Sequence, residues 1–455
     1  MSTLAKTELN APITGRQDLL EYLLAGARPR PDWGVGVESE KLVVDAVTGE
    51  AADHVQIGRL LETLAATGDW REIREDGYLM ALFGKHSSIT LEPGGQLEHS
   101  GRFCPDLHCS AGDLQEHIHT ILQTGESLGL AFLGLGVQPF TPLEKIDWLP
   151  KKRYGIMGPY MMRTGDMGQR MMKQSAGLQV NFDFADETDG VEKLRLCFAL
   201  SPLLYALFAN SPFMDGKPSG FLSSRGEIWA RTDADRCGLI TELLKDGASF
   251  TTYVEYALDV PMYFIIRDGG LIDLTRDRLT FRRYMSEGFE GIEPTLTDWD
   301  LHLSTLFPEA RLRPQIEVRS ADALPPNLTL AMAALLKGVL YDAEAMSATW
   351  DLFRDMDLDE HLLSYRQSWR KGLQAPSGKR TLQDLALQVL DLSASGLKRQ
   401  AAVSQHGLDE TIFLDGVNEI AHSGITLAEK LLSLWTGDRK KDLAMLRDHC
   451  GFRIN

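Results

Sequence analysis

Two carboxylates flank a sharp bend in the stretch from Ile89 to Glu98, ITLEPGGQLE. Glu92 ends a short β-prone run, Pro93 fixes one turn dihedral, and the two glycines after it permit positive φ, so the backbone can reverse here. The chain then resumes strand-like alternation, which places Gln96 and Glu98 on one face. Alone, the stretch fits an ordinary solvent-exposed hairpin. The same arrangement of polar side chains, however, recurs elsewhere in the chain.

Three further strand-like stretches carry acids, amides or arginine on one alternating face: VGVESE at 35–40, LQVNFDF at 178–184 and QIEVR at 315–319. A solvated sheet face usually mixes Lys, Thr and Ser with its acids. These faces instead hold Glu, Gln and Asn, whose oxygens bind Mg²⁺, and Arg, whose planar guanidinium binds phosphate. If the strands share one sheet, the carboxylates crowd together, and divalent cations relieve their repulsion. The pattern favours a metal site formed by Glu38, Glu40, Glu92, Glu98 and Glu317 over four unrelated exposed strands.

The composition limits the partners and the surroundings of the chain. Its 455 residues, 44% of them hydrophobic and 24% charged, are of ordinary globular composition. A net charge of −17 argues against nucleic acid, which needs a basic surface. No apolar run approaches the roughly 20 residues of a membrane span, and the start, MSTLAKTELNAPITG, lacks the features of a signal peptide. We therefore expect a cytoplasmic monomer or homodimer that binds neither nucleic acid nor membrane.

The five cysteines are an odd and sparse set, which is typical of reduced thiols in a cytosol. Cys104 and Cys109 are too far apart for a CxxC motif, and no zinc-binding pattern is present. A bond between these two would close a short loop and so constrain the unfolded chain little. We predict five free thiols and an activity that is insensitive to reductant.

Amphipathic helices are predicted to position the polar-faced strands. Helical periodicity covers 55–66, 113–128 and 192–209, and it dominates from Asn327 to the C-terminus without a Pro/Gly/Ser-rich linker. We therefore predict one domain, 1–455, with a sheet-containing core at 1–325 and a helical layer at 326–455. His117 and His119 are two residues apart, which places them on different faces of the 113–128 helix, and we interpret both as surface histidines.

The segment 150–173 is rich in Gly and Met and carries six Lys or Arg residues. It fits either a methionine-filled irregular core patch or a mobile basic flap. Within it, Arg153 stands beside the aromatic Tyr154. There is no GxxxxGK[ST] loop and no glycine fingerprint opening a βαβ unit. A nucleotide would therefore be bound on the antiparallel polar sheet through metals.

Several long motifs in order resemble one family: GVESEK at 36–41, SITLEPGGQLEHSG at 88–101, FLGLGVQP at 132–139, LQVNFDF at 178–184, ALFANSPF at 206–213, GKPSGFLSSR at 216–225, YALDVPMYF at 256–264 and IEVRSAD at 316–322. Together they look like glutamate–cysteine ligase, in the form found in plants and many proteobacteria. The resemblance runs from about Trp33 to Asp342 and continues weakly into the helical tail.

The resemblance implies an α+β fold: a curved antiparallel β-sheet funnel packed with helices, similar to glutamine synthetase. It also implies a reaction. ATP phosphorylates the γ-carboxylate of glutamate, and the cysteine amine displaces phosphate to give γ-glutamylcysteine, the first step of glutathione biosynthesis, with Mg²⁺ as cofactor. Phosphoryl transfer of this kind depends on charge neutralisation and alignment rather than on a protein nucleophile.

Carried over by motif, the resemblance assigns catalytic roles to Arg153, Arg225 and Glu317. The residues assigned to substrate or ATP are Tyr154, Gln179, Asn181 and Arg319, and those assigned to metal are Glu38, Glu40, Glu92, Glu98 and Glu317. Lys85, which leads into the ITLEPGGQLE stretch, is also predicted to bind substrate or ATP. The plant enzymes carry a disulfide switch with one cysteine in the helix after the IE-x-R stretch, whereas 324–342 contains no cysteine here.

Three other interpretations stay open. An ATP-dependent γ-glutamyl ligase with another amine acceptor would share the metal site, and the acceptor pocket cannot be identified from the sequence. Paired glutamates on strands also occur in glycosidases, but those sites are usually lined by Trp and Tyr, which these polar faces lack. A non-catalytic metal-binding module would leave Arg153 and Arg225 unexplained.

Overall fold

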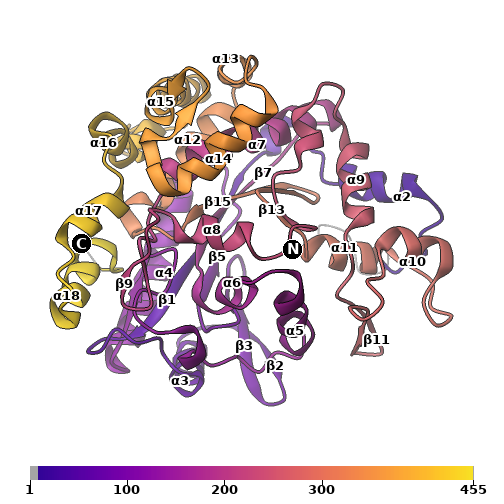
Figure 1. Cartoon of the computed structure of the whole chain (residues 1–455), viewed down its shortest axis with the longest axis horizontal. Helices are drawn as coiled ribbons and strands as arrows, with labels where there is room; N and C mark the ends of the chain where they lie inside the picture. Colours follow the sequence, from indigo (N-terminus) through magenta and orange to yellow (C-terminus); the bar gives the residue numbers. More distant parts are fainter. Residues whose placement is uncertain (1–8, 454–455) are drawn as a thin grey trace.

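A nine-stranded antiparallel sheet forms the centre of the computed structural model, which describes residues 9–453 (Figure 1). The strand order is β14-β15-β7-β1-β5-β4-β3-β2, and β6 pairs with the far end of β1. The strands are β1 (Val35–Asp45), β2 (Arg71–Glu75), β3 (Tyr78–Phe83), β4 (Ser88–Leu91), β5 (Leu97–Ser100), β6 (Leu130–Leu133), β7 (Gly177–Phe182), β14 (Ala310–Leu312) and β15 (Ile316–Asp322).

The four polar-faced stretches lie in adjacent strands, in the order β15-β7-β1-β5. Alternation in β7 buries Leu178, Val180 and Phe182 and leaves the amide side chains on the opposite face. The helices α7 (Glu187–Leu207), α12 (Pro326–Leu340) and α4 (Leu107–Ser127) pack against these strands. The predicted α+β fold, an antiparallel sheet packed with helices, is confirmed.

Further helices surround this centre: α2 (Arg16–Leu24), α3 (His54–Ala65), α5 (Tyr154–Thr164), α6 (Gly168–Gln174), α8 (Ser224–Ala230), α9 (Phe250–Asp259), α10 (Phe281–Glu287), α11 (Leu296–Ser304), α13 (Ala343–Asp351), α14 (Leu358–Lys371), α15 (Leu382–Gln400), α16 (Asp415–Ser423), α17 (Leu427–Leu434) and α18 (Arg439–Cys450). Short two-stranded ladders join β8 (Phe213–Met214) to β9 (Lys217–Pro218), β10 (Cys237–Gly238) to β13 (Phe307–Pro308), β11 (Phe264–Arg267) to β12 (Gly270–Asp273), and β16 (Pro376–Ser377) to β17 (Arg380–Thr381).

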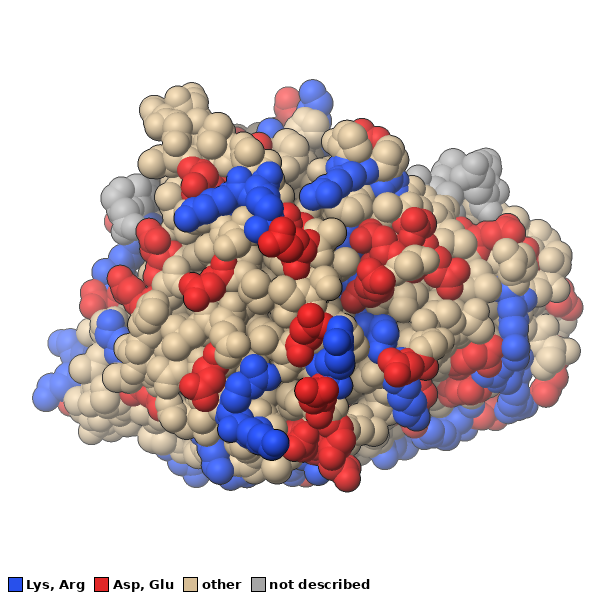
Figure 2. All heavy atoms as spheres, turned by 90° about the horizontal axis from the view of Figure 1, so that it is seen from above, with Lys and Arg blue, Asp and Glu red and all other residues tan. Residues whose placement is uncertain are grey.

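One apolar core extends from Leu9 to Phe452 and joins the sheet to the helices after it. In the helical C-terminal part, α12 packs on β1 and β7, and α15 packs on α12 (Figure 1). The division of the chain into 1–325 and 326–455 stays a prediction. Among the described residues, no helix is long and apolar enough to cross a membrane. Figure 2 shows acidic and basic side chains interspersed over one face, which lacks the continuous basic surface that nucleic acid requires.

The segment 150–173 forms α5 and α6 and packs into the core. Met157, Met161, Met171 and Met172 are all buried, which agrees with the methionine-filled core patch rather than with the flap.

The prediction of five free thiols is wrong, because Cys104 and Cys109 form a disulfide. Cys104 bridges to Val35 at the start of β1, and Asp106 caps α4 by accepting a hydrogen bond from the backbone N of Cys109 at 2.8 Å. The turn that leads into α4 brings the two cysteines together. The prediction of free thiols considered the small entropic gain from closing a short loop but not this turn. The described free cysteines are Cys197, Cys237 and Cys450. Insensitivity to reductant stays a prediction.

The interpretation of both histidines of α4 as surface residues is also wrong. His119 is exposed, but His117 is buried and stacks on His99 with the ring centroids 3.9 Å apart. The helix begins at Leu107, six residues before the predicted start, so α4 covers more of the sheet than the periodicity indicated. Burial lowers the pKa of both His99 and His117.

Candidate active site

A cavity of about 520 Å³ opens on the polar face of the sheet. Strands supply most of its charged lining, α8 supplies Arg225, and loops supply Glu92, Lys152 and Arg153. Nearly all the sequence-predicted site residues meet there: Glu38, Glu40, Glu92, Glu98, Arg153, Tyr154, Gln179, Arg225 and Arg319.

Strand register crowds the acids of this cavity. Glu40 on β1 lies directly opposite Glu98 on β5, and Glu38 follows two residues away on the same face. Burial and the neighbouring Glu92 raise the pKa of Glu40 to about 7. Burial, together with Glu38, Glu92 and Glu40, raises the pKa of Glu98 well above its ordinary value. Burial and mutual repulsion therefore disfavour the charged forms of Glu40 and Glu98.

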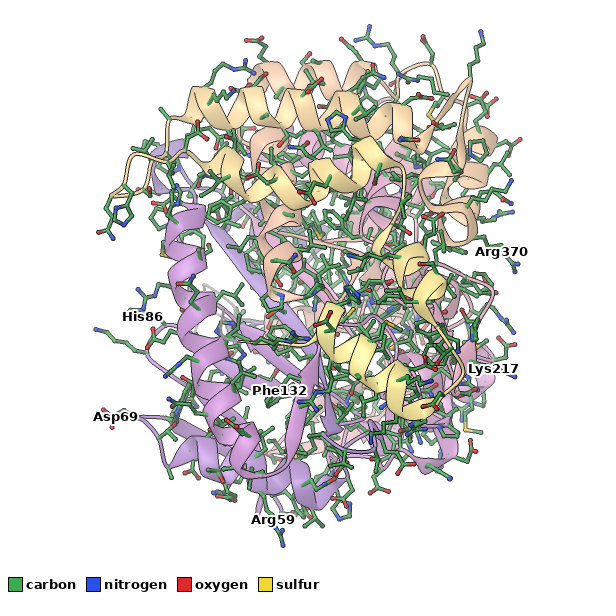
Figure 3. All side chains as sticks on the ribbon, turned by 90° about the vertical axis from the view of Figure 1, so that its left-hand side faces the viewer. Arg59, Asp69, His86, Phe132, Lys217 and Arg370 are labelled. Carbon is green, nitrogen blue, oxygen red and sulfur yellow. A yellow bond between two sulfur atoms is a disulfide. The ribbon has the colours of Figure 1, made fainter. Side chains whose placement is uncertain are left out.

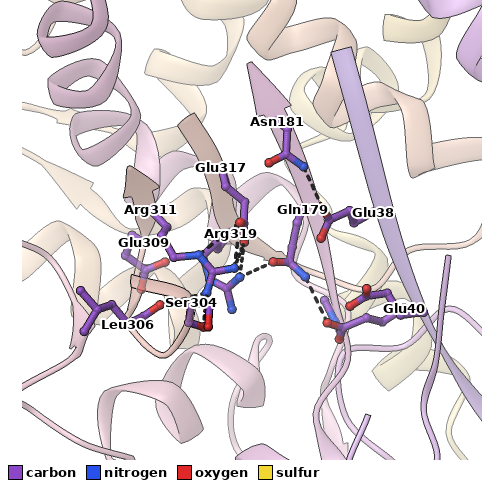
Figure 4. A network of polar contacts seen from close by, with 12 residues as sticks. Glu38, Glu40, Gln179, Asn181, Ser304, Leu306, Glu309, Arg311, Glu317 and Arg319 are labelled. Carbon is purple, nitrogen blue, oxygen red and sulfur yellow. Dashed lines mark hydrogen bonds and ion pairs between the residues drawn. The ribbon is translucent and has the colours of Figure 1, made fainter. Parts of the chain in front are cut away.

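The amides of β7 orient two of these carboxylates (Figure 4). Asn181 Nδ2 donates to Glu38 Oε1 at 2.9 Å, and Gln179 Nε2 donates to Glu40 Oε1 at 3.2 Å. The backbone N of Gly177 donates to Glu40 Oε2 at 2.5 Å. Gln179 and Asn181, predicted to contact substrate or ATP, are thus partners of the acids in this structure.

Glu317 belongs to a different part of the network, where arginines surround it. Arg311 on β14 donates two hydrogen bonds to Glu317, each 2.8 Å, and Arg319 bonds to both Glu317 and Gln179 Oε1 (Figure 4). Burial alone would raise the pKa of Glu317, but Arg311 and Arg319 hold it at about 2. The structure thus shows Glu317 as the anchor of two arginines. Its role as a metal ligand stays a prediction.

Arg225 lies in the first turn of α8, which Ser223 caps by accepting a hydrogen bond from Gly226 N at 3.2 Å. The side chain of Arg225 is only 3% exposed. Its Nη1 donates to the carbonyl of Arg319 at 3.1 Å, whereas its Nε is buried without a partner. A buried guanidinium N–H with no partner is costly unless a ligand accepts from it. Arg225 is therefore placed to receive an anionic group.

The start of α5 closes another side of the cavity. The guanidinium of Arg153 is exposed at the cavity and lies 5.3 Å from the ring of Tyr154, which is itself buried. The Tyr154 hydroxyl and Lys151 Nζ both reach the carbonyl of Leu91, at 3.5 and 2.6 Å. These contacts tie α5 to the strand that leads into Glu92.

Lys85 does not line this cavity, and its predicted contact with substrate or ATP stays a prediction. Lys85 is exposed in the turn between β3 and β4 and lines a second cavity, which contains His99 and His117. Its neighbour His86 projects outward at the edge of the molecule (Figure 3). Proximity in sequence to the ITLEPGGQLE stretch suggested a role, but the turn precedes β4 and leads the lysine away from the acids.

Two parts of the lining were not predicted from the sequence. The first is Arg311, whose strand lies beside β15 and whose guanidinium also bonds to the carbonyls of Ser304 and Leu306, at 3.1 and 3.0 Å. The second is an apolar wall formed by Phe264, Ile266, Leu271, Leu301 and Phe307. Phe264 and Ile266 lie on β11, and strand alternation does not reveal which cavity a strand faces.

The sequence profile of Glutamate-cysteine ligase family 2 (GCS2) matches residues 34–445. The chain belongs to this family. It is 39% identical over 431 residues to glutamate–cysteine ligase B, chloroplastic, of Oryza sativa subsp. japonica, covering 94% of this chain and 85% of the relative. It is 38% identical over 429 residues to glutamate–cysteine ligase, chloroplastic, of Medicago truncatula, covering 94% and 83%.

A solved structure agrees with the fold. The glutamate–cysteine ligase of Francisella tularensis, in complex with AMP, superposes with a TM-score of 0.52 at 14% identity, covering 91% of this chain and 88% of that one. With the family membership, the predicted family, enzyme class and place in glutathione biosynthesis are confirmed.

The chemistry of the acids fits a divalent cation, which the family's reaction implies. Crowded carboxylates with raised pKa values are stabilised when Mg²⁺ supplies positive charge. Within 9–453, no three His, Cys, Asp or Glu side chains converge in a ready-made metal site. Oxygen ligation of Mg²⁺ usually leaves room for water and phosphate.

Gly177→Ala is expected to lower kcat about tenfold while changing the unfolding free energy by less than about 1 kcal/mol. A Cβ at Gly177 would lie 2.5 Å from Arg225 Nη2, the far end of a flexible side chain. The guanidinium would move, and the backbone would not. Steady-state kinetics and urea unfolding measure the two effects. Gly155→Ala is the matched control, because a Cβ there meets nothing within 4 Å. Unchanged kcat in Gly177→Ala would show that the position of this guanidinium is unimportant.

Proposed function

We propose that this cavity binds ATP, glutamate and cysteine, and that the chain forms γ-glutamylcysteine through γ-glutamyl phosphate. A γ-carboxylate oxygen of glutamate attacks the terminal phosphorus of ATP, and ADP leaves. The cysteine amine then attacks the γ-carbonyl carbon, phosphate leaves, and the nitrogen loses a proton. The observation that carries the proposal is the pairing of four crowded glutamates with buried arginines in a single cavity.

The acids and the amides are proposed to form the cation site. Glu38, Glu40, Glu92 and Glu98 would hold Mg²⁺, which when bound neutralises phosphate oxygens. Asn181 and Gln179 hold the carboxylates of Glu38 and Glu40 in place through the hydrogen bonds described above. Because these strands are packed on the core, little reorganisation is needed when charge shifts during the reaction.

The arginines are proposed to bind the groups that gain negative charge. Arg225 offers a buried Nε without a partner, and Arg153 presents its guanidinium at the cavity. Arg319 and Arg311 are fixed by Glu317, so their positive charge is held in a defined position. Arginine suits this task because its planar fork binds two oxygens of one phosphoryl or carboxylate group.

A protein nucleophile is not part of the proposal. Within the described chain, none of the residues that line the cavity is a cysteine or a histidine. Catalysis would then depend on positioning and charge. The cytoplasmic setting and the monomer or homodimer state stay predictions from composition, and the two relatives compared above have chloroplastic names.

A coupled ADP-release assay tests the proposed function. We expect ADP release that requires Mg²⁺, glutamate and cysteine together, because the metal site, the phosphorylated acid and the acceptor amine are all needed for turnover. Each component is omitted in turn, and other amines replace cysteine. Full activity in EDTA would refute the metal role. Equal turnover with another amine would favour a γ-glutamyl ligase of different acceptor specificity.

Arg225→Ala is expected to lower kcat at least ~30-fold, on the scale of ~2 kcal/mol for losing a preorganised charged donor. Arg225→Lys should restore little, because an ammonium cannot reproduce the guanidinium fork. Arg283→Ala, which removes an exposed arginine of α10 paired with Glu287, is the control and should retain wild-type kinetics. Wild-type kinetics in Arg225→Lys would show that the fork geometry is irrelevant.

A further inference from the structure

Asp322 is a completely buried carboxylate at the end of β15, opposite Gly177 in the sheet register. Its Oδ2 accepts hydrogen bonds from the backbone N of Asn210 and from Ser211 Oγ, both at 2.7 Å. Its Oδ1 accepts from Ser223 Oγ at 2.9 Å. All three partners lie on the loop between α7 and α8, so one side chain fixes both ends of this loop to the sheet.

The two serines continue from Asp322 to the helix that carries Arg225. Ser211 Oγ accepts from the backbone N of Arg225 at 3.1 Å, and Ser223 Oγ accepts from Gly226 N at 3.2 Å. An ionised carboxylate only accepts hydrogen bonds, so both hydroxyl protons point at Asp322. Both hydroxyl oxygens are then free to accept from the first turn of α8. The Asp322 carboxylate thus sets the direction of both hydroxyl bonds in this network.

The surroundings allow Asp322 little freedom to move. A Cβ at Gly136 would lie 2.5 Å from the Asp322 carboxyl carbon, so the backbone at Gly136 lies close against the Asp322 side chain. The guanidinium of Arg225 bonds to the carbonyl of Arg319, three residues before Asp322 on the same strand. Arg225 is therefore attached to β15 twice, by its backbone through Ser211 and Asp322 and by its guanidinium through Arg319.

We propose that Asp322 is a positioning residue for Arg225: through Ser211 and Ser223 it fixes the start of α8, and so aims the guanidinium into the cavity. The inference rests on the proposed role of Arg225 in the ligase reaction. Asp322 does not line the cavity and touches no reacting group, so its effect on turnover passes through Arg225.

The substitution Asp322→Asn changes the charge and the hydrogen-bond directions at nearly constant volume. The N–H of Asn210 requires an oxygen, so the new amide nitrogen must face Ser223 and donate to it. The Ser223 hydroxyl then loses its acceptor, and the cap of α8 weakens. We expect kcat to fall about tenfold and KM for glutamate and ATP to change less than twofold. Ser211→Ala, a milder change, should lower kcat in the same way.

A double-mutant cycle distinguishes positioning from a general loss of stability. In the Arg225→Ala background, Asp322→Asn and Ser211→Ala should cause less than a further twofold loss of kcat, because the group they position is absent. Asp442→Asn is the matched control: Asp442 is a buried carboxylate of α18 that accepts from the backbone N and the hydroxyl of Thr436, at 2.8 and 2.9 Å. It should lower the melting temperature and leave kcat unchanged.

The outcomes separate this inference from the proposed function. If Arg225→Ala lowers kcat but Asp322→Asn and Ser211→Ala do not, or if their losses multiply with that of Arg225→Ala, the positioning role is overturned and the role of Arg225 stands. If Arg225→Ala itself retains wild-type turnover, both are overturned. Should Asp322→Asn fail to fold, the Ser211→Ala cycle decides the question in the same way.

Discussion

Glu317→Gln is expected to abolish measurable turnover and to lower the free energy of unfolding by about 3 kcal/mol or more. The substitution removes the negative charge that Arg311 and Arg319 share, and all three side chains are buried. Removing one partner of a buried ion pair typically costs about 3–5 kcal/mol, because the other charge is left uncompensated. The strand pattern alone, with Glu317 as a metal ligand, would predict an intact fold. The arginine pair changes that expectation.

Urea unfolding and ADP release measure the two effects of this substitution. Glu317→Asp is an informative comparison, since it keeps the charge and shortens the reach to Arg311, and it should retain more stability than the glutamine variant. Glu287→Gln, at an exposed ion pair of α10, is the control and should change stability by less than about 1 kcal/mol. A glutamine variant as stable as the wild type would mean that the two arginines need no counter-charge.

The positions of the polar strands could be predicted because alternation has a period of two residues. LQVNFDF has only one register that buries Leu178 and Val180, so Gln179 and Asn181 must face the opposite side. The same argument placed Glu38 and Glu40 on one face. What alternation does not give is the order of strands, and hence that Glu40 would lie opposite Glu98.

The differences from the sequence-based predictions come from contacts that strand alternation and helical periodicity do not reveal. The type of Glu317 fits a metal ligand or an ion-pair partner equally well, and its ion pair with Arg311 depends on the pairing of β14 with β15, while its role as a metal ligand stays a prediction. His117 stands between Glu116 and Ile118 in the sequence and is buried against His99 on β5. Cys104 and Cys109 meet because the chain enters α4 through a capped turn.

The metal-free protein is expected to lose stability as the pH rises from about 4.5 to about 7. Burial and Glu92 raise the pKa of Glu40 from its ordinary 4.5 to about 7. In this window the folded state keeps a proton that the unfolded chain has released, so the stability that the proton confers is lost as the pH rises through the folded pKa. For one partly buried group, the loss is on the order of 2 kcal/mol and is complete by about pH 8. Glu38 and Glu98, whose pKa values are also raised, should add to it in the same direction.

Glu40→Gln should therefore be more stable than the wild type at pH 8 in EDTA, because the change relieves repulsion between carboxylates. It should also be at least ~100-fold less active, because the change removes a metal ligand worth several kcal/mol to phosphoryl transfer. Urea unfolding at several pH values between 5 and 8, in EDTA and in Mg²⁺, measures the stability. Mg²⁺ should restore the wild type at pH 8 and stabilise the variant less, since binding to the folded state stabilises it by mass action. Glu287→Gln should follow the wild type throughout. If Glu40→Gln is destabilised at pH 8 in EDTA, then Glu40 is not a carboxylate under repulsion. If Mg²⁺ stabilises both proteins equally, then Glu40 does not hold the ion, and the cation site lies elsewhere.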